Sequence, residues 1–92
     1  MMKDLGDRVE VTGAMTLSEA KGLLAEGDGF IARADTVFDL AGVTDVDSSG
    51  LAVVFGWQRA AKRLGKQIRI ANPPHNLRSL ADVYGVGELL PL

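Results

Sequence analysis

The chain has 92 residues and no cysteine, which fits one domain over residues 1–92 and excludes disulfides and thiolate metal sites. Its formal net charge is −2 and its isoelectric point is near 5.2, far below the value typical of a nucleic-acid-binding domain, so we expect no nucleic-acid partner. The chain has neither the apolar core of a secretory signal nor a run long enough to span a membrane, so we expect a soluble, cytoplasmic protein without direct membrane insertion.

The first half of the chain predicts a strand, a helix and a second strand. Residues 8–12 alternate polar and apolar side chains as a half-buried strand does, whereas residues 1–5 are too short to assign. The capping-box spacing of residues 16–19 begins a helix that we expect to end near the glycines at 27–29. We expect its inward side chains to be Leu17, Ala20, Leu23 and Leu24. The apolar run 36–40 fits a central strand.

The second half of the chain begins with a predicted long helix, which is followed by a strand. The helix runs from about Ser49 to Leu64, and Gly65 supplies its C-terminal stop. Residues 67–71 alternate again and form the next strand, which the sequence Asn72-Pro73-Pro74 ends.

A third helix precedes Gly85, and an apolar tail over residues 86–92 must pack on this domain or on a partner. We expect the inward side chains of this helix to be Leu77, Leu80, Ala81 and Tyr84. Strands separated by helices imply right-handed crossovers, and therefore an α/β fold whose sheet contains parallel pairs.

Two hydroxyls and a carboxylate stand at the start of the second helix, in the sequence Asp47-Ser48-Ser49-Gly50. The first turn of a helix has free backbone N–H groups and the positive end of the macrodipole, so it favours side-chain oxygens and phosphate alike. One interpretation is that Ser48 or Ser49 caps the helix, most naturally Ser49. The other is that Ser48 binds a partner or accepts a modification.

The second helix has an apolar face that is too wide for one sheet to cover. Two adjacent arcs form it, one with Leu51, Val54, Phe55, Gln58 and Ala61, the other with Val53, Trp57, Ala60 and Leu64. Either the first helix or the tail covers Val53 and Trp57, or these two residues form a docking face for a protein partner.

Charge is divided unevenly between the halves of the chain. Residues 1–47 carry four Lys or Arg against ten Asp or Glu (−6), and residues 48–92 carry six against two (+4). We interpret the basic set as a solvated helix face; it comprises Arg59, Lys62, Arg63, Lys66, Arg69 and Arg78.

No pattern of catalytic residues emerges. Asp39 ends an apolar strand as a phosphatase nucleophile does, but Ala41 stands where the acid would be. Asp39, Asp45 and Asp47 could hold Mg²⁺, although solvated carboxylates at turns explain them better. His75 has no partner in the sequence and no phosphate-binding loop is present. We therefore expect no enzyme activity, no cofactor and no metal.

The segment Asp47-Ser48-Ser49-Gly50-Leu51 after a strand, with the helix to Gly65 and the elements that follow, resembles the STAS domain family of anti-sigma-factor antagonists over nearly the whole chain. The resemblance implies a STAS fold, with a mixed sheet of about four strands and helices largely on one side. It also implies that Ser48 is the hydroxyl that a partner anti-sigma serine kinase phosphorylates in that family.

The apolar second helix and the ending from Leu80 to Pro91 are similar to one branch, the MlaB-like STAS subunits of Gram-negative phospholipid ABC transporters. This resemblance implies binding to an MlaF-like cytoplasmic ATPase subunit and a peripheral place at the inner membrane through that partner. The implied partner-binding residues are Asp47, Ser48, Ser49, Gly50, Val53 and Trp57. An antagonist switched by phosphorylation of Ser48 remains the alternative.

Overall fold

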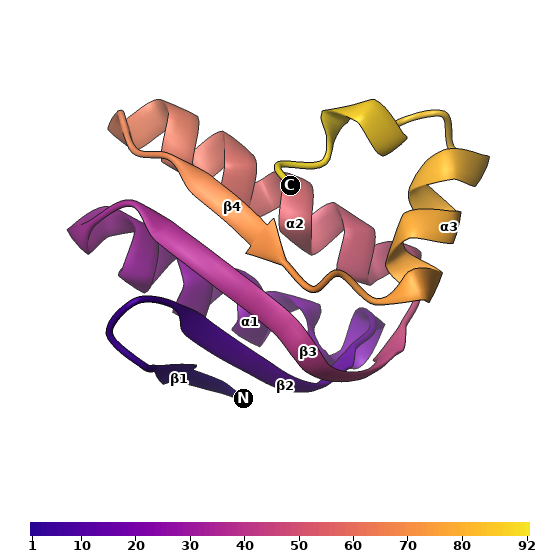
Figure 1. The fold of residues 1–92 in the computed structure, drawn as a ribbon, viewed down its shortest axis with the longest axis horizontal. Helices are drawn as coiled ribbons and strands as arrows, with labels where there is room; N and C mark the ends of the chain where they lie inside the picture. Colours follow the sequence, from indigo (N-terminus) through magenta and orange to yellow (C-terminus); the bar gives the residue numbers. More distant parts are fainter.

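Strands and helices alternate along most of the chain, and the computed structural model describes all 92 residues. The elements in chain order are β1 (Met2–Asp4), β2 (Val9–Met15), α1 (Leu17–Arg33), β3 (Thr36–Val46), α2 (Ser48–Leu64), β4 (Ile68–Ala71), α3 (His75–Val83) and the short 3₁₀ helix η1 (Gly87–Leu89). The strands form one sheet in the order β1-β2-β3-β4 (Figure 1). Only the β1–β2 pair is antiparallel, so the sheet is mixed.

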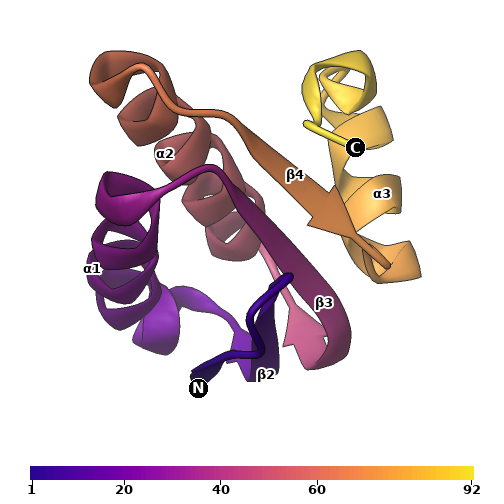
Figure 2. The same ribbon diagram turned by 60° about the vertical axis from the view of Figure 1, so that its left-hand side comes forward.

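The two long helices lie on one face of the sheet. Each connects neighbouring parallel strands, α1 from β2 to β3 and α2 from β3 to β4, and crossovers of the same hand place both on the same side. Figure 2 shows α1 and α2 side by side, with α3 next to β4. The predicted α/β fold, a mixed sheet of four strands with helices largely on one side, is confirmed.

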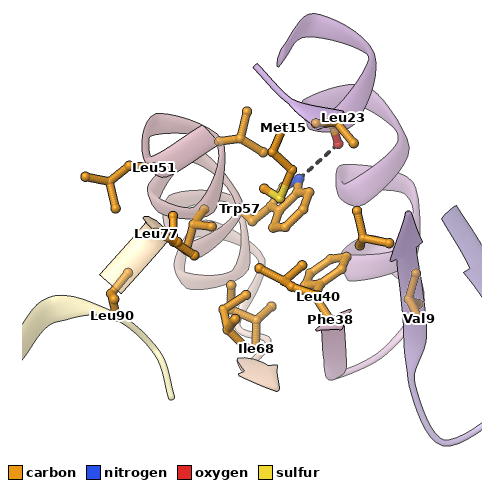
Figure 3. Close-up of a cluster of buried hydrophobic side chains, with 14 of the residues drawn as sticks. Val9, Met15, Leu23, Phe38, Leu40, Leu51, Trp57, Ile68, Leu77 and Leu90 are labelled. Carbon is orange, nitrogen blue, oxygen red and sulfur yellow. Dashed lines mark hydrogen bonds between the residues drawn. The ribbon is translucent and has the colours of Figure 1, made fainter. Parts of the chain in front are cut away.

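The indole of Trp57 is fully buried between the sheet and α1 (Figure 3). Its ring stacks on Phe38 with centroids 4.1 Å apart, and its Nε1 donates a hydrogen bond of 3.0 Å to the carbonyl oxygen of Leu23 in α1. Val53 is also buried. The prediction of an exposed docking face at Val53 and Trp57 is therefore wrong, because α1 packs beside α2 and covers these residues.

α1 continues to Arg33 instead of ending near residues 27–29. Gly27 lies inside the helix, at a point where a Cβ atom would lie only 2.0 Å from Nε1 of Trp57. This glycine lets the indole approach the helix backbone, so it is a packing residue and not a helix stop. Leu17, predicted to face inward, is 74% exposed because it is the first residue of the helix and lies beyond the core.

β3 is longer than predicted and reaches Val46. Its pairing with β2 contains two register shifts, one between Asp39 and Gly42 and one between Val43 and Asp45, and ends with Val46 paired to Met15. Such irregularities break the alternation of buried and exposed side chains, so the second half of the strand lacks the expected pattern.

The helices α2 and α3 end close to the glycines that were predicted to stop them. Gly65 and Gly85 both adopt the left-handed conformation (φ 69° and 70°) that ends α2 and follows α3. Tyr84, however, is 58% exposed and not inward; it is the C-cap of α3, which ends at Val83. The tail packs on this domain, since Ile70 N donates to the carbonyl of Pro91 at 2.7 Å.

Candidate functional site

The carboxylate of Asp47 joins the first turns of the two long helices. Its Oδ1 accepts a hydrogen bond from Ser49 N at 2.8 Å, which caps α2, and its Oδ2 accepts one from Leu17 N at 3.2 Å at the start of α1. The cap is therefore Asp47 and neither serine, which corrects the prediction that Ser48 or Ser49 fills this role. A carboxylate at this position also interacts favourably with the helix macrodipole.

Ser48 is the first residue of α2 and its side chain is exposed, whereas Asp47 and Ser49 are half-buried. Because Asp47 provides the cap, the Ser48 hydroxyl is not needed for it. The junction thus presents a hydroxyl to solvent at the positive end of a helix of 17 residues.

Gly50 is buried against β2. A Cβ atom here would lie 2.5 Å from the carbonyl oxygen of Met15 and 3.0 Å from Cγ1 of Val46. The glycine in the Asp-Ser-Ser-Gly segment therefore allows α2 to start close to the strand, and it does not face a partner directly.

An open hollow of about 480 Å³ lies between the start of α2 and α3. Its lining residues are Val46, Asp47, Ser48, Asn76, Ser79, Leu80, Val83 and Tyr84. Val83, the last residue of α3, is 79% exposed, and Tyr84, its C-cap, is 58% exposed. Two large side chains, one apolar and one aromatic, therefore line this hollow together with Ser48.

Exposed Leu17 lies on another side of the same junction, since its backbone N–H is bonded to Asp47. We call Leu17, Asp47, Ser48, Val83 and Tyr84 together the Ser48 surface. Sequence analysis found Asp47 and Ser48 but missed the other three. The available signal was that Leu17 directly follows the N-cap position of α1 and that Tyr84 directly precedes Gly85, since residues at helix ends are the least reliably placed by periodicity.

The carboxyl group of Asp39 on β3 is bound from three sides. Asn72 Nδ2 and Ala41 N donate to Oδ1, each at 3.0 Å, and Arg8 Nε donates to Oδ2 at 3.1 Å. The hydrogen bond from Asn72, then that from Ala41 N and the interactions with Arg8 lower the pKa of Asp39 below its usual value, although burial opposes them. Asp39 is thus an ionised group that joins the sheet to the loops around it.

Asp39, Asp45 and Asp47 do not converge on one point, and no group of three or more acidic or histidine side chains is arranged to hold a metal ion. His75 begins α3, is exposed, and lies 3.3 Å from Ser79 through its Nε2. No helix has the length and apolarity needed to cross a membrane.

Comparison with known sequences identifies relatives of the chain. Residues 2–91 match the family described as Mlab, STAS domain. The intermembrane phospholipid transport system binding protein MlaB of Haemophilus influenzae is 31% identical over 51 residues, which are 55% of this chain and 49% of that protein. The similarity thus spans about half the length of that relative.

Two solved structures share the fold at 16% sequence identity. One is the anti-sigma factor antagonist SpoIIAA in its unphosphorylated form, with a TM-score of 0.72 over 98% of this chain and 84% of that one. The other is the Bacillus cell fate determinant SpoIIAA in the phosphorylated form, with a TM-score of 0.70 over 98% and 86%. Because the family match covers nearly all residues and the fold agrees with it, the chain belongs to the Mlab-type STAS domain family.

Proposed function

We propose that this STAS domain is a non-catalytic subunit that binds the MlaF-like ATPase subunit of an ABC-type phospholipid transporter, supports its activity, and so helps to maintain outer-membrane lipid asymmetry. The observation that carries the proposal is the Ser48 surface, an exposed hydroxyl flanked by exposed apolar side chains. The Mlab-type family and the name of the Haemophilus relative support this choice of partner. The domain would then work in the cytoplasm, held at the inner membrane through its partner.

The composition of the Ser48 surface suits a protein contact. Tyrosine is enriched among the residues that dominate binding energy, since it buries a large rigid ring and retains a polar tip. Tyr84, Val83 and Leu17 are all more than half exposed, so a partner would remove substantial apolar surface from water. Asp47 holds both helix starts in place, which lowers the entropic cost of binding.

The proposed partner contacts shift relative to the sequence prediction. Asp47, Ser48 and Ser49 remain candidates for direct contact. Gly50, Val53 and Trp57 are buried and would act only by fixing the position of α2. Substitutions at these three positions are therefore expected to impair folding before they impair binding.

Co-purification with the transporter ATPase of the source organism tests the proposal. The Tyr84→Lys variant places a charge in the proposed interface and should lose the ATPase. The Leu64→Lys variant is the matched control, because Leu64 is also an exposed apolar residue (44%) but ends α2, about 25 Å from Ser48. Retention of the ATPase by Tyr84→Lys, with the domain folded, would contradict the proposal.

A second candidate function is an anti-sigma-factor antagonist switched by an anti-sigma serine kinase. The exposed hydroxyl of Ser48 on the first turn of α2 favours it, because a helix N-terminus tolerates the roughly −1.5 to −2 charge of a phosphoserine. The neighbouring Asp47 would add to the negative charge that a partner must accommodate.

Incubation with the anti-sigma kinase of the source organism and ATP, followed by mass spectrometry, tests this second function. Phosphorylation should occur on Ser48 and be absent from the Ser48→Ala variant. An unmodified protein after incubation with an active kinase would exclude the switch.

A further inference from the structure

The solvent face of α2 becomes strongly basic in its C-terminal half. Arg59, Lys62 and Arg63 follow the spacing i, i+3 and i+4, which places them on one side of the helix. Lys66 follows Gly65 beyond the end of α2 and lines the same hollow as Lys62. The first three are exposed and Lys66 is half-exposed. We call these four residues the basic surface. Figure 1 shows this end of α2 at the upper left, far from α3 and the Ser48 surface.

The charge of the basic surface is not neutralised within the domain. α2 contains no Asp or Glu, and the three ion pairs of the structure involve only Arg8 and Arg33 as cations. Like charges at i and i+4 repel one another on a helix. The helix macrodipole compensates Lys62 and Arg63 in the last turn, but it falls off within one turn and does not account for Arg59.

The surroundings of these cations indicate what kind of anionic counterpart fits. A protein interface generally needs a buried apolar or aromatic anchor and is depleted in lysine. Around the basic surface the exposed apolar residue is Leu64, at 44%. An anionic lipid surface needs no such anchor, because it attracts a row of Lys and Arg through its diffuse negative potential, and one leucine adds a small apolar contribution.

We propose that the basic surface binds the headgroups of an anionic phospholipid membrane at its surface, without insertion. Ser48 begins α2, and at about 1.5 Å of rise per residue the basic surface starts about 16 Å from it at Arg59 and reaches about 22 Å at Arg63. The membrane and a partner on the Ser48 surface can therefore be bound at the same time. The inference does not depend on the identity of that partner, since it concerns a different part of the domain.

Sedimentation with lipid vesicles tests the inference. The domain should bind vesicles of equimolar phosphatidylglycerol and phosphatidylcholine at low salt, and it should not bind vesicles of phosphatidylcholine alone. Binding to the anionic vesicles should weaken strongly at 0.1 M salt, because the Debye length is then only about 10 Å. Each Lys or Arg near an anionic surface contributes a factor of roughly five. The variant Lys62→Glu/Arg63→Glu/Lys66→Glu should therefore bind at least about a hundredfold more weakly.

A control variant separates the basic surface from net charge. Lys3→Glu/Lys21→Glu/Arg78→Glu makes the same change in net charge at exposed cations on other elements and should retain binding. Circular dichroism verifies that both variants are folded. Failure of the native domain to bind anionic vesicles at low salt, equal binding to phosphatidylcholine, or equal loss in the two variants would each overturn the inference.

Discussion

Gly22 and Gly27 lie in the same helix but have different surroundings. A Cβ atom at Gly27 would lie 2.0 Å from Nε1 and 2.6 Å from Cδ1 of Trp57, whereas nothing lies within 4 Å of a Cβ atom at Gly22. Alanine at each position gives the same gain in helix propensity, but only Gly27→Ala adds atoms where the indole lies. The pair therefore isolates the contact between α1 and the buried tryptophan.

The two substitutions should have opposite effects on the free energy of unfolding. Gly22→Ala should stabilise the domain by about 0.8–1 kcal/mol, which raises Tm by about 4–8 °C for a domain of this size. Gly27→Ala has the same gain, but it displaces the ring at a cost of about 1–3 kcal/mol. It also breaks the hydrogen bond from Trp57 to Leu23 O, for about 1 kcal/mol more. The net result is a destabilisation of about 1–3 kcal/mol.

Urea denaturation followed by the fluorescence of Trp57, the single tryptophan of the chain, measures both effects. Gly29→Ala repeats the control, because its added Cβ atom also meets nothing within 4 Å. If Gly27→Ala were as stable as Gly22→Ala, Trp57 would not pack on α1, and the assignment of Val53 and Trp57 to the core would fail.

Three further substitutions test the site and its support. Asp47→Ala removes the cap of α2 and should lower stability by about 0.5–2 kcal/mol in thermal denaturation, whereas Asp45→Ala, at an exposed position, should change it little. Asp39 has a lowered pKa in the folded state, so its stabilising contribution is present above its unfolded pKa of about 3.9 and is lost as pH falls through the folded value. The Asp39→Asn variant should therefore lose less of its free energy of unfolding on acidification than the native domain, as measured by denaturation curves at a series of pH values. An identical pH dependence in the two proteins would contradict the stabilising role of ionised Asp39. Gly50→Ala places a Cβ atom 2.5 Å from Met15 O and should cost about 1–3 kcal/mol; a wild-type Tm would contradict the close packing of α2 on β2.

Sequence patterns predicted the fold where periodicity and stop signals agree. Strands exist where 8–12, 36–40 and 67–71 predicted them, although β2 and β3 continue to Met15 and Val46, and the stop at Gly65 is confirmed. The boundaries failed where tertiary contacts override local signals. The position of Trp57 explains Gly27 inside α1, and no local pattern reveals that contact.

The candidate site was predicted only in part. The Asp47-Ser48 segment at a helix start was recognisable because capping chemistry is local. The exposed residues Leu17, Val83 and Tyr84 were not, since their exposure depends on where each helix ends. The over-wide apolar face of α2 was real, but α1 covers it within the domain. One sequence cannot distinguish an internal cover from an external partner.

Site-specific photocrosslinking tests the central claim most directly. A photoreactive phenylalanine derivative in place of Tyr84 preserves an aromatic ring at the Ser48 surface, and the same residue in place of Leu64 probes the far end of α2. In the assembled complex, we expect crosslinks from position 84 to the ATPase subunit and none from position 64. Crosslinks to the ATPase from position 64 alone would show that the Ser48 surface is not the docking site.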